Sequence, residues 1–294
     1  MTALAGYGDP IRSLRHPLAV QIRRIVRRPQ AGRRLGLFLL DGVHLVEEAL
    51  DSPHRPECLL FSPRLEAGAA GRRLIERIVD RQWPLWPATD DLIANLAPTD
   101  TPQGILALFR RPAEPPQTLL PRAGGTGGAS PWPSPPLGLL LAGLQDPANA
   151  GALARTARAL GCHVLVTTAG TADPYHVRAL RASSGAVLGM QVAAGVEVAD
   201  LAGWAAGERA MLIGLDARRG RPVVELGVLC DCDARPQLLV LGSEGAGIPD
   251  PVDRLCAEHV RIPMVAGADS LGVVAAGTIA LHEWMRGARG PGGP

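Results

Sequence analysis

The sequence predicts an α/β protein in which strands and helices alternate along the chain. Three observations support this prediction: an apolar fraction of 47% with 20% charged residues, short apolar runs bounded by glycine or proline, and amphipathic segments between those runs. Such a composition is typical of a folded globular protein. The 294 residues are enough for two domains that each bury a core.

The first part of the chain predicts a small α/β domain over residues 1–111. Before its first strand, Leu18, Ile22 and Ile25 recur at helical spacing with Val26, which predicts a docked first helix. The elements expected after it are a strand at 38–40, a helix at 42–50, a strand at 58–61, a helix at 72–81 and a strand at 104–109.

Residues 112–136 are expected to be a linker. The segment is rich in Pro, Gly and Ser, which sustain neither helix nor strand, so we expect a semi-extended tether between two folded units.

Residues 137–294 predict a larger domain built on a parallel sheet. Continuous apolar strands alternate there with helices, which is typical of strands buried on both faces. The expected strands are 137–141, 162–166, 190–192, 210–215, 237–241 and 259–262. The expected helices are 149–160, 177–183, 201–207, 252–257 and 273–285.

All 30 basic side chains of Lys and Arg type are arginine, because the chain contains no lysine. This excludes a lysine Schiff base or general base, and it suits contact with phosphates and bases, since guanidinium is a planar fork. Eight arginines lie within residues 1–40 against one acid, Asp9, so this segment carries +7 and the remainder −5. The asymmetry favours a nucleic-acid partner. A solvated amphipathic face or an organelle presequence is the alternative.

Five cysteines show no framework spacing, which favours a reducing compartment and a cytoplasmic protein. Cys230 and Cys232 lack a second ligand pair at zinc-finger spacing, and Cys256 with His259 does not complete one, so no metal is expected. No apolar run reaches membrane-spanning length, and the first ten residues lack the pattern of a signal peptide. We therefore expect no membrane partner.

Three blocks of glycine and polar residues follow predicted strands in the second domain. The first contains Asn149 and Arg155, the second contains Glu244 between glycines, and the third contains Met264 and Ser270. Because the carboxyl ends of parallel strands gather at one edge of the sheet, we expect one shared ligand pocket there. An ordinary phosphate loop is the alternative for the second block, although it lacks the Lys-Ser/Thr of a P-loop and the G-x-G-x-x-G frame.

Two of these side chains also have a purely structural interpretation. Asn149 stands just before a predicted helix and is suited to cap it. Glu244 is suited to cap the short helix that follows its turn, and an ion pair with Arg155 is compatible with either role.

In this order and spacing, the blocks resemble the three signature motifs of the SpoU or TrmH family. Members of that family transfer a methyl group from S-adenosylmethionine (AdoMet) to a ribose 2′-hydroxyl of RNA. The resemblance implies a fold of the SPOUT type, with a trefoil knot formed from about Ile262 onward and a homodimer built around it. Residues 38–50 and the turn at 101–107 resemble the family's N-terminal RNA-binding domain more loosely, and a generic α/β domain is the alternative there.

The resemblance also implies residue roles. It gives a catalytic set of Arg155, Glu244, Asn149 and Ser270 and a cofactor-binding set of Gly242, Ile262, Leu271 and Met264. Since a guanidinium is a poor base, holding the acceptor phosphate and stabilising developing charge is the easier role for the arginine.

One position departs from the family pattern. The third motif usually runs Ser-Leu-Asn, and here Gly272 stands where the asparagine is expected. Either water or Ser270 substitutes for the lost amide, or the enzyme is weak, or methyl transfer has been lost. Because the other polar positions are retained, we expect an AdoMet-dependent RNA 2′-O-methyltransferase, with ribosomal RNA as the preferred substrate and transfer RNA as another possibility. A catalytically silent RNA-binding protein is the alternative hypothesis.

Overall fold

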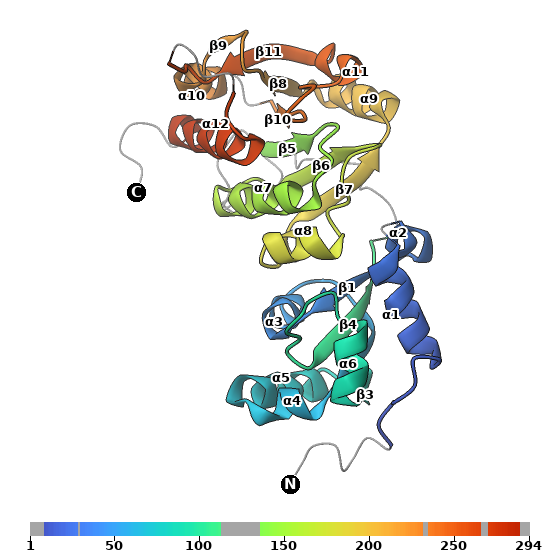
Figure 1. Cartoon of the computed structure of the whole chain (residues 1–294). Helices are drawn as coiled ribbons and strands as arrows, with labels where there is room; N and C mark the ends of the chain where they lie inside the picture. Colours follow the sequence, from blue (N-terminus) through green and yellow to red (C-terminus); the bar gives the residue numbers. More distant parts are fainter. Residues whose placement is uncertain (1–8, 29, 113–135, 232–234, 266–269, 289–294) are drawn as a thin grey trace. The chain divides into compact units, whose positions relative to one another are not determined.

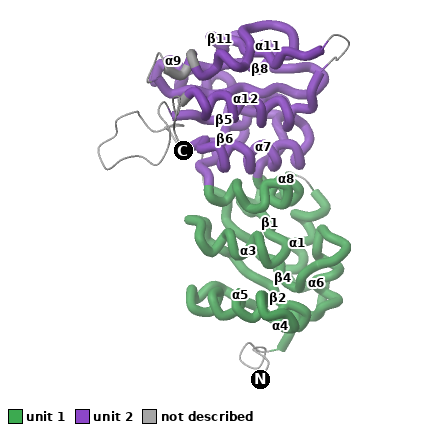
Figure 2. The backbone as a smooth tube through the Cα atoms, turned by 90° about the vertical axis from the view of Figure 1, so that its left-hand side faces the viewer, with its two compact units in different colours: residues 1–113, 175–189 green, residues 114–174, 190–294 purple. Residues whose placement is uncertain are grey.

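The computed structural model describes residues 9–28, 30–112, 136–231, 235–265 and 270–288 (Figure 1). Its Cα packing separates two compact units, which we call unit 1 (residues 1–113 and 175–189) and unit 2 (residues 114–174 and 190–294) (Figure 2). Nearly all of the expected linker lies outside the described residues, so the domain boundaries at 111 and 137 stay a prediction. The packing differs from them in assigning residues 175–189 to unit 1, where Tyr175 packs on Phe38 with ring centroids 5.1 Å apart.

Unit 1 contains a sheet whose described strands run in the order β1-β4-β2-β3. The strands are β1 (Leu37–Asp41), β2 (Pro56–Phe61), β3 (Leu85–Pro87) and β4 (Ile105–Arg110). β4 pairs antiparallel with β1 and β2, and β3 pairs parallel with β2. The predicted strands and helices of this region are confirmed, and β3 is an addition, because three residues are too few to form a visible pattern.

Helices cover both faces of this sheet (Figure 1). On one face α1 (Pro17–Arg27) and α6 (Asp90–Leu96) form a buried cluster in which Ile22 and Ile93 pack with Leu39. The other helices of the unit are α2 (Ala31–Leu35), α3 (Val43–Leu50), α4 (Pro63–Ala67), α5 (Ala69–Asp80) and α8 (Val177–Ala182). Of these, α3 and α8 both pack on β1.

Unit 2 contains a wholly parallel sheet in its described part, with strand order β7-β6-β5-β10-β8-β11-β9. The strands are β5 (Leu137–Leu141), β6 (Val164–Thr168), β7 (Gln191–Val196), β8 (Met211–Leu215), β9 (Arg221–Pro222), β10 (Gln237–Leu241) and β11 (Cys256–Arg261). The predicted α/β class and parallel sheet are confirmed. The chain order of the strands reverses between β5 and β10, which is where sheets of this type bind ligands.

The helices of unit 2 form a layer on each face of the sheet (Figure 1). They are α7 (Pro147–Ala159), α9 (Val198–Glu208), α10 (Leu226–Asp231), α11 (Asp250–Asp253) and α12 (Val273–Ala288). α7, α10 and α12 pack together, and the buried Trp284 of α12 donates from Nε1 to Gln237 Oε1 of β10 at 2.6 Å. Trp204 of α9 and Val252 of α11 belong to the cluster on the other face.

Two expected elements near the end of the chain are wrong in their bounds. The helix expected at 252–257 is α11, which begins earlier because Pro251 suits the first turn of a helix and Pro249 lies just before it. β11 accordingly begins at Cys256 rather than at His259. The trefoil knot stays a prediction. None of the helices in the described ranges is both long and apolar enough to cross a membrane.

Candidate active site

A cavity of about 460 Å³ opens at the carboxyl ends of β8, β10 and β11. These three strands are neighbours in the sheet, so their ends lie at one edge. The lining comes from residues 215–218 after β8, residues 241–248 after β10, Ile262 and Met264 after β11, and residues between 270 and 276 at the start of α12. Segments up to about sixty residues apart in the sequence therefore meet at one cavity.

Most of the residues that the sequence motifs single out lie around this cavity. The six that line it are Gly242, Glu244, Ile262, Met264, Ser270 and Leu271. The two others, Asn149 and Arg155, do not line it. The geometry thus brings together the whole predicted cofactor-binding set and half of the predicted catalytic set, while their individual roles stay predictions.

A tight turn after β10 forms one wall of the cavity. Ser243 and Gly247 exchange two backbone hydrogen bonds of 2.9 Å, and Gly247 has a φ of +71°. The turn folds back so closely that a Cβ added at Gly242 would lie 2.1 Å from the carbonyl carbon of Gly247. Glycine at position 242 is therefore required by this close approach of backbone. Because α11 begins only at Asp250, the turn does not open directly into a helix as a phosphate loop does.

Asn149 connects α7 to this turn. Its Nδ2 donates to Glu244 Oε1 at 2.9 Å, across 95 residues of sequence. The expected capping roles are wrong for both side chains. Asp146 caps α7 by accepting from the backbone N–H of Ala148, since Pro147 suits the first helical position and moves the start of the helix upstream of Asn149. Glu244 lies six residues before α11 and does not cap it.

Arg155 lies on α7, exposed, six residues beyond Asn149. Six helical residues turn a side chain about 240° around the axis, so Arg155 and Asn149 point in different directions. The expected ion pair between Arg155 and Glu244 does not form in the described part of the chain. The Glu244 carboxylate accepts from the Asn149 amide instead.

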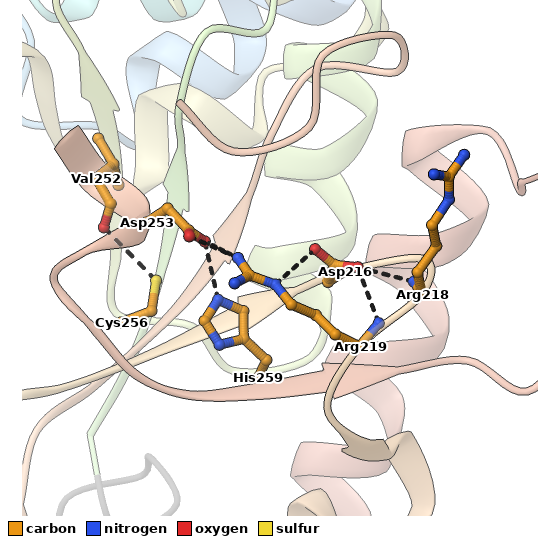
Figure 3. Close-up of polar contacts among 7 residues, drawn as sticks. All are labelled: Asp216, Arg218, Arg219, Val252, Asp253, Cys256 and His259. Carbon is orange, nitrogen blue, oxygen red and sulfur yellow. Dashed lines mark hydrogen bonds and ion pairs between the residues drawn. The ribbon is translucent and has the colours of Figure 1, made fainter. Parts of the chain in front are cut away.

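The sequence motifs missed the loop after β8, where Asp216, Ala217 and Arg218 line the cavity. Asp216 accepts from the backbone N–H groups of Arg218 and Arg219 at 2.8 and 3.0 Å and from Arg219 Nε at 3.1 Å (Figure 3). Burial alone would raise the pKa of Asp216, but these hydrogen bonds lower it below its ordinary value. The available signal was an acidic residue directly after a predicted strand of the same sheet.

Arg219 ties this loop to the neighbouring strand and helix. Its Nη2 donates to both carboxylate oxygens of Asp253, and His259 Nε2 lies 2.9 Å from Asp253 Oδ1 (Figure 3). Hydrogen bonds from Arg219 and His259 lower the pKa of Asp253. The cavity wall at 216–218 is thereby held by a network that reaches α11 and β11.

Asp253, Cys256 and His259 also meet the spacing of a possible metal site, with ligand atoms within 4.8 Å of one another. One feature of the site opposes a cation: the guanidinium of Arg219 already neutralises Asp253.

Gly272 leaves room for the side chain that the family motif carries. A Cβ added there meets no atom of the described residues within 4 Å, and the residue is exposed. The loss of the asparagine is therefore not imposed by packing around this position.

Curated proteins of known name are similar to this chain over most of its length. A chain of Streptomyces viridochromogenes described as a 23S rRNA (uridine(2479)-2′-O)-methyltransferase is 28% identical over 262 residues, covering 86% of this chain and 84% of its own. A 23S rRNA (guanosine(2553)-2′-O)-methyltransferase of Bacillus subtilis is 26% identical over 250 residues, covering 85% of this chain and 88% of its own.

A solved structure shows the same fold. The SpoU methyltransferase AviRb of Streptomyces viridochromogenes, in complex with the cofactor AdoMet, superposes with a TM-score of 0.77 at 26% identity and covers 92% of this chain and 97% of its own. The MRM3-like substrate binding domain matches residues 21–107, and the SpoU rRNA Methylase family matches residues 136–282, half of the chain. The chain belongs to the SpoU rRNA methylase family.

Proposed function

We propose that the chain transfers the methyl group of AdoMet to a ribose 2′-hydroxyl of RNA, with ribosomal RNA as the substrate. The observation that carries the proposal is the convergence of the motif residues on one cavity at the sheet edge. The two relatives described above are named for this reaction on 23S rRNA, and the solved relative is named as a complex with AdoMet.

The residues around the cavity fit AdoMet. The backbone of residues 242–247 lines the cavity, and Ile262, Met264 and Leu271 supply apolar surface for the adenosine part of AdoMet. When bound, AdoMet supplies a methyl group on a positively charged sulfonium. Glu244 and Asp216 line the cavity as carboxylates, which suits a cationic ligand.

In this proposal the remaining polar residues position the acceptor. Asn149 fixes the Glu244 carboxylate through its hydrogen bond, and Ser270 offers a hydroxyl at the cavity. Arg155, which is exposed, holds the acceptor phosphate of the RNA. The alignment of the 2′-oxygen with the methyl group is then the main contribution to the rate acceleration.

The basic surface of unit 1 suits the RNA backbone. Arg24, Arg27, Arg28 and Arg34 surround a shallow hollow of about 350 Å³, and all four are exposed. None of them forms an ion pair with a carboxylate of the described residues. Unpaired guanidinium groups clustered in this way attract phosphates.

We further propose a homodimer in the cytoplasm. Arg155 is exposed and does not line the cavity of its own chain, which leaves room for a second copy to complete the site. Cys58, Cys162 and Cys256 are free thiols, as a reducing compartment requires. Sedimentation equilibrium tests this proposal. A homodimer should sediment with twice the mass of one chain, which is 30.8 kDa.

The experiment is methyl transfer from tritiated AdoMet to unmodified ribosomal RNA, followed by alkaline hydrolysis. A 2′-O-methyl group blocks cleavage at its own phosphate, so the proposal predicts tritium in alkali-resistant dinucleotides. Tritium in mononucleotides would indicate base methylation and would overturn the choice of acceptor. No incorporation by a folded protein that binds AdoMet would favour the silent RNA-binding alternative.

A further inference from the structure

The loop after β8 places an unpaired cation at the cavity of unit 2. The charged residues that line the cavity in the described part of the chain are Asp216, Arg218 and Glu244, so Arg218 carries the positive charge among them. Its side chain is exposed and forms no hydrogen bond or ion pair with any described residue. A guanidinium without a partner beside a ligand cavity is available to bind an anionic group of that ligand.

The next arginine of the same loop has a different role. Arg219 donates to the carboxylates of Asp216 and Asp253, so its charge is already used inside the protein (Figure 3). The side chain of Arg218 points away from this network (Figure 3). One arginine of the pair therefore anchors the loop, and the other is left for a ligand.

Hydrogen bonds fix the backbone from which Arg218 projects. Asp216 Oδ1 accepts from the backbone N–H groups of Arg218 and Arg219, and the backbone N–H of Asp216 donates to the carbonyl oxygen of Val260 on β11 at 2.9 Å. Binding through Arg218 would therefore order one side chain and no backbone. The entropy cost of such a contact is small, because the loop is already in place.

The other charges of the cavity indicate what kind of ligand group Arg218 can meet. Glu244 accepts from Asn149, and Asp216 accepts from Arg219, so both carboxylates are held in position. Two carboxylates beside one guanidinium suit a ligand that carries positive and negative groups together. They oppose an RNA phosphate, which would have to approach both of them.

We propose that Arg218 binds the carboxylate of the methionine part of AdoMet. This carboxylate is the anionic group of the cofactor, and its two oxygens match the planar fork of a guanidinium. The apolar surface for the adenosine part comes from other segments, after β11 and at the start of α12. Different parts of the chain thus recognise the two ends of the cofactor. The inference rests on the proposed function, because it takes AdoMet as the ligand.

The test compares AdoMet with decarboxylated AdoMet, which lacks the carboxylate and keeps the sulfonium, the amine and the adenosine. Calorimetric titrations with each compound use the parent protein and Arg218→Gln. The parent should bind AdoMet about tenfold more tightly than the decarboxylated compound, since an exposed charged contact of this kind contributes about one factor of ten. Arg218→Gln should lose this preference, and its affinity for decarboxylated AdoMet should stay within about threefold of the parent value.

Arg254→Gln is the matched control. Arg254 is exposed in unit 2 and does not line the cavity, so this variant removes the same charge and should keep the preference for AdoMet. Because the Arg218 side chain has no partner among the described residues, Arg218→Gln should melt within about 1 °C of the parent. Equal affinity of the parent for the two compounds would overturn the proposal. Equal weakening of both compounds by Arg218→Gln would overturn it as well.

Binding of ribosomal RNA, measured by filter retention, separates a second source of the anion. If Arg218→Gln keeps the preference for AdoMet but binds the RNA several-fold more weakly, the guanidinium serves a phosphate and the proposal is wrong.

The tritium assay described above separates this proposal from the proposed function. A parent that prefers AdoMet through Arg218 but transfers no tritium to RNA would contradict the methyl transfer and leave the carboxylate contact standing. Tritium transfer by a parent that binds both compounds equally would overturn the contact alone. A parent that binds neither compound would overturn both.

Discussion

Two pockets in the described part of the molecule, one in each unit, are built in opposite ways. The cavity of unit 2 is lined by loops that follow neighbouring parallel strands, and much of its wall is backbone held by Gly242 and Gly247. The pocket of unit 1 is lined by side chains from four separate segments, around the buried Asp41. A pocket made of strand-end turns leaves short contiguous motifs in the sequence, whereas a pocket made of converging side chains leaves none.

The largest effect is expected where backbone forms the wall. Gly242→Ala would force a Cβ into the carbonyl group of Gly247, so the turn at 243–247 must move and AdoMet binding should fall about a hundredfold or more. Gly245→Ala is the control, because a Cβ at Gly245 meets nothing within 4 Å although the residue lines the same cavity. Calorimetry with AdoMet checks both variants. Equal loss in both would mean that turn geometry is not the cause.

A smaller effect is expected from the polar bridge between α7 and the turn. Asn149→Ala and Glu244→Ala should each lower the rate of methyl transfer by about ten- to a hundredfold. Each variant removes the hydrogen bond that fixes the position of the other side chain. The double variant should be no slower than the worse single variant. Additive losses in single-turnover kinetics would show that the two residues act independently.

The basic surface of unit 1 should contribute a few-fold to RNA affinity. Arg27→Gln removes one unpaired guanidinium, so the slope of log K against log salt for single-stranded RNA should become shallower by about 0.7. Arg73→Gln, an exposed arginine of α5 outside this surface, should leave the slope closer to that of the parent. A larger change of slope for Arg73→Gln than for Arg27→Gln would indicate that the RNA binds another face of unit 1.

The network behind the loop at 216–218 predicts a pH-dependent stability. The pKa of Asp253 is lowered in the folded chain, so its contribution is complete above the unfolded pKa of 3.8 and is lost as the pH falls through the lower folded value. Asp253→Asn should therefore lower Tm at pH 6 to 8, and the difference from the parent should shrink below about pH 4. Asp250→Asn, an exposed residue at the start of α11, is the control. A difference that is constant with pH would exclude the ion pair as its source.

The smallest effect is expected at Gly272. Because no atom of the described residues lies within 4 Å of a Cβ at this position, Gly272→Asn should fold like the parent, with Tm within about 1 °C of the parent value. Methyl transfer should change by no more than about threefold, because the proposed site works without that amide. A gain of a hundredfold or more in a steady-state assay would identify the native chain as an impaired enzyme.

Much of the fold could be predicted from periodicity, since continuous apolar strands such as β5 and β10 depend on local sequence alone. β3 and α6 could not, because they are short and their apolar residues are buried by packing with distant segments. The same distinction holds at the site. Gly242 and Leu271 belong to recognisable motifs, whereas the contact of Asn149 with Glu244 depends on how α7 packs, and the motif spacing pointed to Arg155 instead.

The most direct test of the central claim is a calorimetric titration of the purified parent with AdoMet, with S-adenosylhomocysteine as competitor. One saturable site per chain, shared by both compounds, is the result that a cofactor cavity at the ends of β8, β10 and β11 predicts. No binding to a protein that melts cooperatively would contradict it, and would leave the chain as an RNA-binding member of its family.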